Sequence, residues 1–128
     1  MQLLNSFLFH GLLISTKNSR EGSFKATIVM FLLKHYVSPN GVDLFGLWLE
    51  SLRDKQARAR VAARMLRLQN GNFGDCKPVG EGVSEMRIHV GAGYRVYFKQ
   101  VGMEIVILLA GGDKSSQPKD IDTALNLA

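Results

Sequence analysis

The spacing of apolar and polar residues changes along the chain, and each change marks a different kind of element. Residues 30–37 form a short apolar and aromatic run, which is typical of a strand. Over residues 42–52, and again over residues 56–69, apolar residues recur at steps of three and four, which predicts two helices. Asp43 is a suitable N-cap for the first helix, and the glycine-rich residues 70–74 end the second.

The period then changes to two. Residues 83–90 and 94–99 alternate between apolar and polar positions, which predicts two strands joined by a glycine-bearing turn. Residues 104–110 are apolar on both faces and are expected to form the central, most buried strand. The stretch that precedes residue 83 is expected to be a loop, and Pro118 is expected to begin a last helix.

This order predicts one α+β domain over residues 30–128, with an antiparallel sheet, an N-terminal helical hairpin and a C-terminal helix. Residues 1–29 are expected to be an N-terminal extension. Either Met30 is the natural start, or the extension adds a further helix or strand to the domain. Residues 1–14 have no basic residue before their apolar run and are too short to span a membrane.

Composition narrows the function classes. The chain has 128 residues, of which 46% are hydrophobic, and this excludes a wholly disordered protein. Cys76 is the only cysteine, which excludes a disulfide scaffold and a multi-cysteine zinc site. The three histidines do not cluster, so we expect neither a metal nor a cofactor. The net charge of +5 suits an anionic partner, although it also suits many proteins that have none.

Two regions concentrate positive charge. Alternation turns one set of polar side chains to the same face of the predicted sheet, and Lys114 follows the last strand closely enough to reach that face. This set consists of Arg87, His89, Arg95, Tyr97 and Lys99. Cations hold phosphates and an aromatic ring can stack on a base, so this face suits RNA. The alternative is an ordinary solvated face on which Glu85 pairs with Arg87 or Arg95.

The second helix carries the other basic region. Arg60, Arg64 and Arg67 share one face of that helix by their spacing. This face would dock onto ribosomal RNA or onto an acidic partner, or it is simply a solvated helix surface.

Several separated segments resemble one family. Residues 68–74, 77–89, 93–98 and 111–117 resemble, in this order, segments of the RelE/ParE toxin superfamily, and more narrowly of the HigB-like, phage-derived addiction-module killer proteins. The resemblance extends over residues 30–128. It implies a RelE-like fold in which the open face of the sheet is the active surface.

The resemblance also implies a function. It implies the cytoplasmic toxin of a type II toxin–antitoxin system, a metal-independent endoribonuclease that cuts messenger RNA on the ribosome and inhibits translation. The expected partners are that RNA and a helix-turn-helix antitoxin of the HigA-like type, with operator DNA bound only through the antitoxin and no membrane. Two alternatives are a ParE-like inhibitor of DNA gyrase that is not an enzyme, and an inactive relic that binds only its antitoxin.

Site residues follow from the resemblance position by position. Arg95 matches the family arginine that stabilises the reacting phosphate, Arg87 lies where relatives carry a lysine, and Lys114 matches the basic residue after the last strand. The family's C-terminal tyrosine has no counterpart, which leaves Tyr97 and His89 as candidates for the general base. Further RNA contacts are expected from Lys77, Lys99, Arg60, Arg64 and Arg67.

Overall fold

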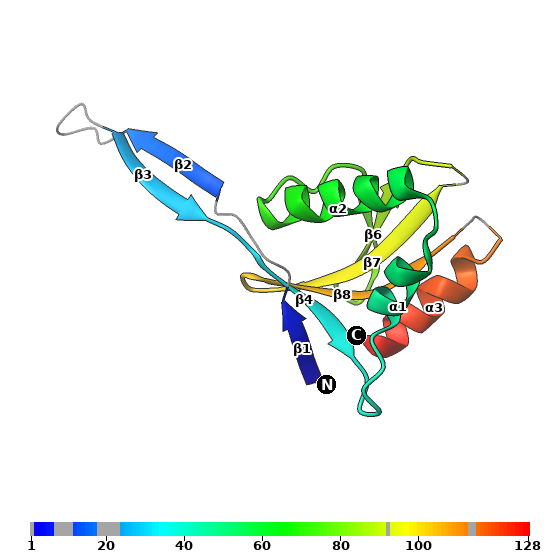
Figure 1. Ribbon diagram of the computed structural model, residues 1–128. Helices are drawn as coiled ribbons and strands as arrows, with labels where there is room; N and C mark the ends of the chain where they lie inside the picture. Colours follow the sequence, from blue (N-terminus) through cyan, green and yellow to red (C-terminus); the bar gives the residue numbers. More distant parts are fainter. Residues whose placement is uncertain (1, 7–11, 18–23, 92, 113–114) are drawn as a thin grey trace.

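A six-stranded sheet forms the centre of the protein (Figure 1). The computed structural model describes residues 2–6, 12–17, 24–91, 93–112 and 115–128. The strands of the sheet, in spatial order, are β1 (Gln2–Ser6), β4 (Leu32–Val37), β8 (Glu104–Gly111), β7 (Tyr94–Val101), β6 (Val83–Ile88) and β5 (Cys76–Gly80). A separate antiparallel pair, β2 (Leu12–Lys17) and β3 (Phe24–Val29), projects away from this sheet.

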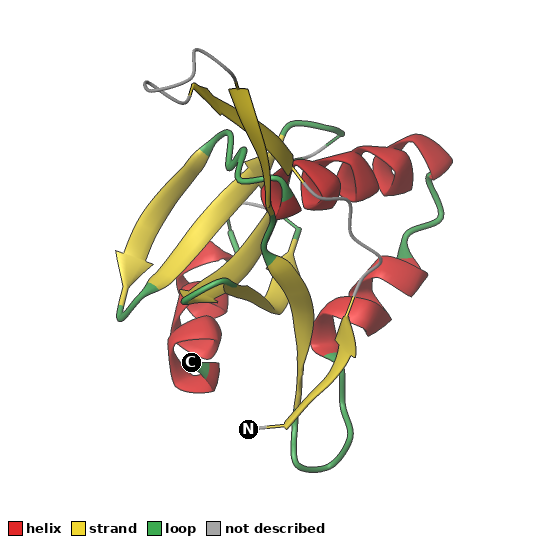
Figure 2. Cartoon of the chain, turned by 90° about the vertical axis from the view of Figure 1, so that its left-hand side faces the viewer, coloured by secondary structure: helices red, strands yellow, loops and turns green. Residues whose placement is uncertain are grey.

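Helices lie on both faces of the sheet (Figure 2). Helices α1 (Leu44–Ser51) and α2 (Lys55–Gln69) cover one face, and α3 (Gln117–Leu127) covers the other. Asp43 caps α1 by accepting a hydrogen bond from the Gly46 amide, which confirms its predicted role. Asp54 caps α2 in the same way through the amides of Gln56 and Ala57.

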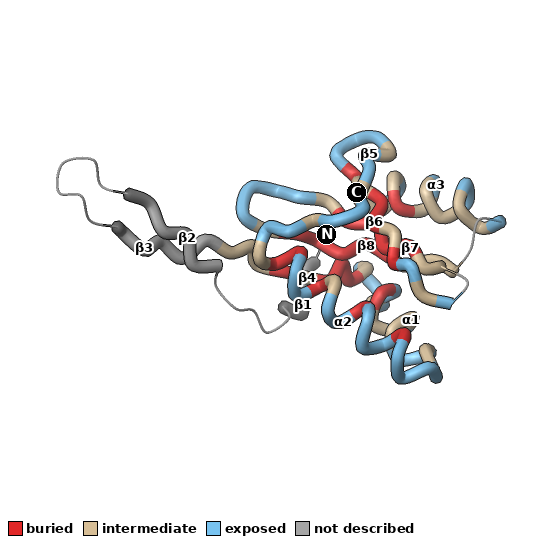
Figure 3. The backbone as a smooth tube through the Cα atoms, turned by 90° about the horizontal axis from the view of Figure 1, so that it is seen from above, coloured by how far each residue is buried: buried red, intermediate tan, exposed pale blue. Residues whose placement is uncertain are grey.

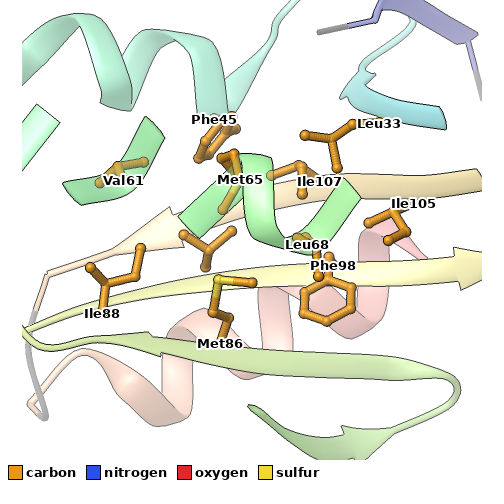
Figure 4. Packing of buried hydrophobic residues seen from close by; sticks show 11 residues of the cluster. Leu33, Phe45, Val61, Met65, Leu68, Met86, Ile88, Phe98, Ile105 and Ile107 are labelled. Carbon is orange, nitrogen blue, oxygen red and sulfur yellow. The ribbon is translucent and has the colours of Figure 1, made fainter. Parts of the chain in front are cut away.

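The larger core lies between α1, α2 and the sheet (Figure 4). Phe45 from α1 and Met65 and Leu68 from α2 meet Leu33 of β4 and Ile107 of β8 there. These side chains are at most 4% exposed, so they supply most of the apolar burial that holds the two helices in place. The opposite, arginine-bearing face of α2 remains exposed (Figure 3).

A second core lies under α3. Ala124 packs there against Val83, Tyr97 and Leu108, which come from three neighbouring strands. The register between β7 and β8 shifts after Tyr97, and the shift brings both Leu108 and Leu109 into this core. The face that the resemblance implied to be open is therefore covered in part by α3.

The predicted fold class is wrong in its sheet and in its helical hairpin. The sheet is mixed, because β4 runs parallel to β8, with Leu33 opposite Ile105. The two helices follow four strands, and they pack on the sheet instead of forming a terminal hairpin. Helix α1 lies over β4 and β8, whereas α2 lies over β6. An apolar pattern shows that a strand is buried, but it does not show in which direction the strand runs, so the parallel pair could not be read from it.

The loop predicted before residue 83 is also wrong in part, because Cys76–Gly80 forms the edge strand β5. This strand is mostly exposed and carries Pro78, so it lacks the apolar alternation that marks a strand. Within the described part of the chain, no helix has the length and apolar character needed to cross a membrane.

Candidate functional site

Strand register brings three cations to one carboxylate on the face that α3 covers. Arg87 of β6 lies directly opposite Arg95 of β7, and Glu85 lies opposite Tyr97. On the other side of β6, Lys77 of β5 lies opposite Glu85. Like charges on directly opposite residues repel each other. The shared carboxylate is therefore the counter-ion that allows the two arginines to be neighbours.

The Glu85 carboxylate is the centre of this group, which we call the Glu85 cluster (Lys77, Glu85, Arg87, Arg95, Tyr97 and Gln117). Glu85 is 0% exposed. Its Oε1 atom lies 3.4 Å from Arg87 Nε, 3.7 Å from Arg95 Nε and 3.9 Å from Lys77 Nζ. Three positive charges therefore surround the Glu85 carboxylate, and the Asp120 carboxylate of α3, which also acts on Tyr97, lies nearby, so the cluster keeps a smaller surplus of positive charge.

Two neutral groups complete the coordination of the carboxylate. The Tyr97 hydroxyl donates to Oε2 at 3.0 Å, and the Gln117 amide donates to the same atom at 2.9 Å. Burial by itself would raise the pKa of Glu85, but the hydrogen bonds from Gln117, Tyr97 and Arg87 outweigh it and hold the pKa below its ordinary value. Glu85 is therefore ionised at neutral pH, and Gln117 ties the start of α3 to the sheet.

The expectation that Tyr97 faces solvent and stacks on a base is wrong. Tyr97 is 0% exposed, because α3 covers this part of the sheet and the ring packs in the second core. Burial and the neighbouring Glu85 carboxylate raise the pKa of Tyr97. Its hydroxyl is thus held protonated as a hydrogen-bond donor, which does not suit the general-base role considered for it.

The three cations differ in their access to solvent. The side chains of Lys77 and Arg87 are 50% and 39% exposed, so both can contact a ligand. The Arg95 side chain is only 11% exposed, and its buried Nε has no hydrogen-bond partner among the described residues. Arg95 therefore adds positive charge from below the surface, whereas Lys77 and Arg87 form the part of the cluster that a ligand reaches.

His89 does not join the Glu85 cluster, contrary to the predicted alternation. Strand β6 ends at Ile88, and the His89 side chain pairs with Asp75, with 2.7 Å between Nε2 and Oδ2. The hydrogen bond from His89 is the main reason that the pKa of Asp75 is lowered. The strand ends one residue too early for the alternation to extend to His89.

His89 instead borders a pocket of about 280 Å³ between α2 and the end of β6, which we call the arginine pocket. The predicted helix-face residues Arg60, Arg64 and Arg67 line it together with Ala63 and Ile88. The sequence-predicted cations therefore form two groups, one on each face of the sheet.

Two other predicted residues add little to either group. Lys99 lies on β7 opposite Val83, two positions beyond Tyr97, and is partly buried. Lys114 lies outside the described residues. Among the described residues, no group of three or more His, Cys, Asp or Glu side chains is placed to hold a metal ion.

Sequence reasoning missed Glu85 and Gln117 as members of the site. From the sequence, Glu85 was expected only as a salt-bridge partner on an ordinary solvated face. Its position between Val83 and Arg87 on one strand face was the signal that could have identified it. Gln117 carries no such signal, since its role depends on where α3 docks.

Comparisons with known proteins place the chain among its relatives. No family model matches it, and no solved structure matches it. It is 54% identical over 84 residues to an uncharacterized protein of Haemophilus influenzae, an alignment that covers 66% of this chain and 85% of that protein. The chain therefore belongs to the same family as this Haemophilus influenzae protein.

Proposed function

We propose that this protein is the toxin of a type II toxin–antitoxin pair, and that it cuts messenger RNA on the ribosome with the help of the Glu85 cluster. The observation that carries the proposal is the convergence of Lys77, Arg87 and Arg95 on a single buried carboxylate, which leaves positive charge available to a phosphate. The resemblance of residues 77–89 and 93–98 to RelE/ParE toxins supports it. A cytoplasmic location and a helix-turn-helix antitoxin belong to the same proposal.

The chemistry is an attack by the ribose 2′-oxygen on the adjacent phosphorus. The new bond gives a cyclic phosphate, the bond to the 5′-oxygen breaks, and that oxygen takes up a proton to leave as a hydroxyl. Negative charge grows on the phosphoryl oxygens in the transition state, and fixed cations stabilise it more than they stabilise the ground state. Arg87 and Lys77 would contact these oxygens, while Arg95 strengthens the field from beneath them.

A general base must take the proton from the 2′-hydroxyl. His89 is the candidate, because histidine is the side chain that most often serves as a general base and its Nε2 lies 2.7 Å from Asp75 Oδ2, which helps to orient the ring. His89 follows Arg87 by two residues at the end of β6, so an RNA strand that crosses the following turn would pass both side chains. His89 thus acts beside the cluster, not within it.

The experiment is induced expression of the full chain in bacteria without an antitoxin, followed by mapping of messenger RNA 5′ ends. We expect growth arrest with new 5′ ends inside reading frames, and loss of both in Arg87→Ala. Arg58→Ala is the matched control, because Arg58 is an exposed arginine of α2 that lies in neither site. Arrest with intact messages would contradict the proposed cleavage.

A second candidate is a non-enzymatic toxin that binds DNA gyrase. The burial of Tyr97 and Arg95 favours it, since both side chains then serve the packing of α3 and do not contact a substrate. This candidate predicts trapped gyrase–DNA breaks, intact messages, and arrest that persists in Arg87→Ala.

A further inference from the structure

The arginine pocket is separate from the Glu85 cluster and has the features of a ligand site. It lies between α2 and the end of β6, whereas the cluster lies on the opposite, α3-covered face. Its volume of about 280 Å³ lies just below the range of about 300 to 1,000 Å³ that is usual for small-molecule sites, which suits a small ligand group. Of the described residues that line it, three are arginines and none is acidic.

Arg64 is held in place before any ligand arrives. Its Nη1 donates to the Arg87 carbonyl at 2.7 Å and its Nη2 donates to the Phe73 carbonyl at 3.1 Å. These two bonds occupy only part of the five N–H donors of a guanidinium. A preorganised cation with donors to spare binds an anion without the loss of side-chain entropy that a free arginine suffers.

Arg60 and Arg67 complete the site from the exposed surface of α2. Each is separated from Arg64 by one helical turn, so the three guanidinium groups lie on one side of the helix. Ala63, which is exposed, gives the pocket an apolar part beside these charges, and the buried Ile88 lies beneath it. Such a combination suits a ligand that has both an anionic group and an apolar face.

Charge balance selects the kind of anion. The three arginines carry three positive charges, and the nearby Asp75 carboxylate, which pairs with His89 and also interacts with Arg64, offsets part of that charge. A phosphomonoester carries about −1.5 to −2 at pH 7, which matches the remainder, whereas a backbone phosphodiester carries only one charge. We propose that the arginine pocket binds a phosphomonoester group, with Arg64 as its fixed anchor and Arg60 and Arg67 closing on it.

The test is a titration of the full chain with small anions. Binding is monitored by the NMR chemical shifts of the backbone amides of Ala63 and His89. The probes are inorganic phosphate, adenosine 5′-monophosphate, adenosine, and a short poly-glutamate peptide. We expect both phosphate probes to shift these amides and adenosine alone to leave them unchanged. If the nucleotide binds more tightly than inorganic phosphate, the phosphomonoester belongs to a nucleotide or to an RNA end. If the two bind equally, the ligand is free phosphate.

Variants connect the binding to the pocket. Arg67→Ala should weaken phosphate binding by about tenfold, as expected when one charge-assisted hydrogen bond is removed. Arg58→Ala, an exposed arginine of the same helix outside the pocket, should leave binding unchanged. Gly74→Ala provides a second variant, because its added Cβ would lie 2.9 Å from Arg64 Nη2. It should also weaken phosphate binding, and because Gly74 has φ +66°, its folding is checked by the amide spectrum before binding is measured.

Three results would overturn the proposal: no amide shift with either phosphate probe, binding of the glutamate peptide but not of phosphate, or an equal loss of binding in Arg58→Ala. His89 borders both sites, but Arg67 is neither a member of the Glu85 cluster nor the proposed base, so a failure of phosphate binding would not by itself contradict the proposed messenger RNA cleavage. Conversely, the effect of Arg87→Ala on cleavage would not test phosphate binding in the arginine pocket, because the Arg87 side chain does not line it.

Discussion

Arg87 and Arg95 lie directly opposite each other on β6 and β7, and both direct their Nε atoms at the buried carboxylate of Glu85, at 3.4 and 3.7 Å. Two cations at opposing strand positions would repel each other without a counter-ion. The carboxylate therefore stabilises the sheet and, at the same time, keeps two arginines close together on one surface.

Removal of the carboxylate charge should destabilise the fold strongly. Glu85→Gln leaves the buried Arg95 without its counter-ion, for which a loss of about 3 to 5 kcal/mol in the free energy of unfolding is typical, whereas Lys77 and Arg87 are partly exposed and remain hydrated. Urea denaturation at pH 7 measures this loss. Glu50→Gln, at an exposed position on α1, is the control and should change little. The double variant Glu85→Gln/Arg95→Met should recover part of the lost free energy of unfolding, because it removes the buried Arg95 charge that Glu85→Gln leaves without a counter-ion.

Stability should fall in acid because of the same carboxylate. The pKa of folded Glu85 is lower than its ordinary value of 4.5, so the unfolded chain binds a proton at a higher pH than the folded one does. The stabilisation that ionised Glu85 contributes is therefore complete above pH 4.5, and it is lost as the pH falls through the lower pKa of the folded protein. Denaturation curves between pH 6 and about pH 3 should show this decline in the wild type. The decline should be smaller in Glu85→Gln, where only other groups such as Asp75 still titrate. Equal slopes in the two proteins would contradict the assignment.

A side chain at Gly111 should destabilise the packing of α3. Gly111 lies opposite Arg95 on β8, and a Cβ added there would collide with the Asp120 carboxylate of α3, which is held by the Ser116 hydroxyl. We expect Gly111→Ala to lower the free energy of unfolding by about 1 to 3 kcal/mol, as overpacking does. Gly112→Ala is the matched control, because none of the described residues lies within 4 Å of its added Cβ. A melting temperature that drops equally in both variants would argue against close packing of α3 on Gly111.

The thiol of Cys76 should react slowly. Burial is the main factor that raises the pKa of Cys76, and its Sγ donates to the Phe73 carbonyl at 3.0 Å. The thiolate is the reactive form, so alkylation at pH 8 should be slower in the folded protein than in the urea-unfolded chain. The rates can be followed by mass spectrometry, because Cys76 is the only cysteine. Equal rates would show that the thiol is not shielded.

Local elements could be predicted from the sequence because their signals are local. The capping role of Asp43, the second helix and the strands around residues 83–110 all follow from side-chain type and spacing. The direction of β4 beside β8 and the position of α3 over the sheet depend on contacts between distant parts of the chain. The same limit applies to the site, because α3 decides that Tyr97 is buried and the end of β6 decides that His89 leaves the cluster.

The central claim is that positive charge on the Glu85 cluster serves the cleavage of messenger RNA. Its most direct test is 5′-end mapping of a single message in purified translating ribosomes, with wild-type, Arg87→Ala and Arg58→Ala proteins of matched thermal stability. We predict cuts with the wild type and Arg58→Ala, and a rate lower by about 10²- to 10³-fold in Arg87→Ala, as when one transition-state donor is removed. Cleavage that is absent in the wild type, or unchanged in Arg87→Ala, would contradict the account.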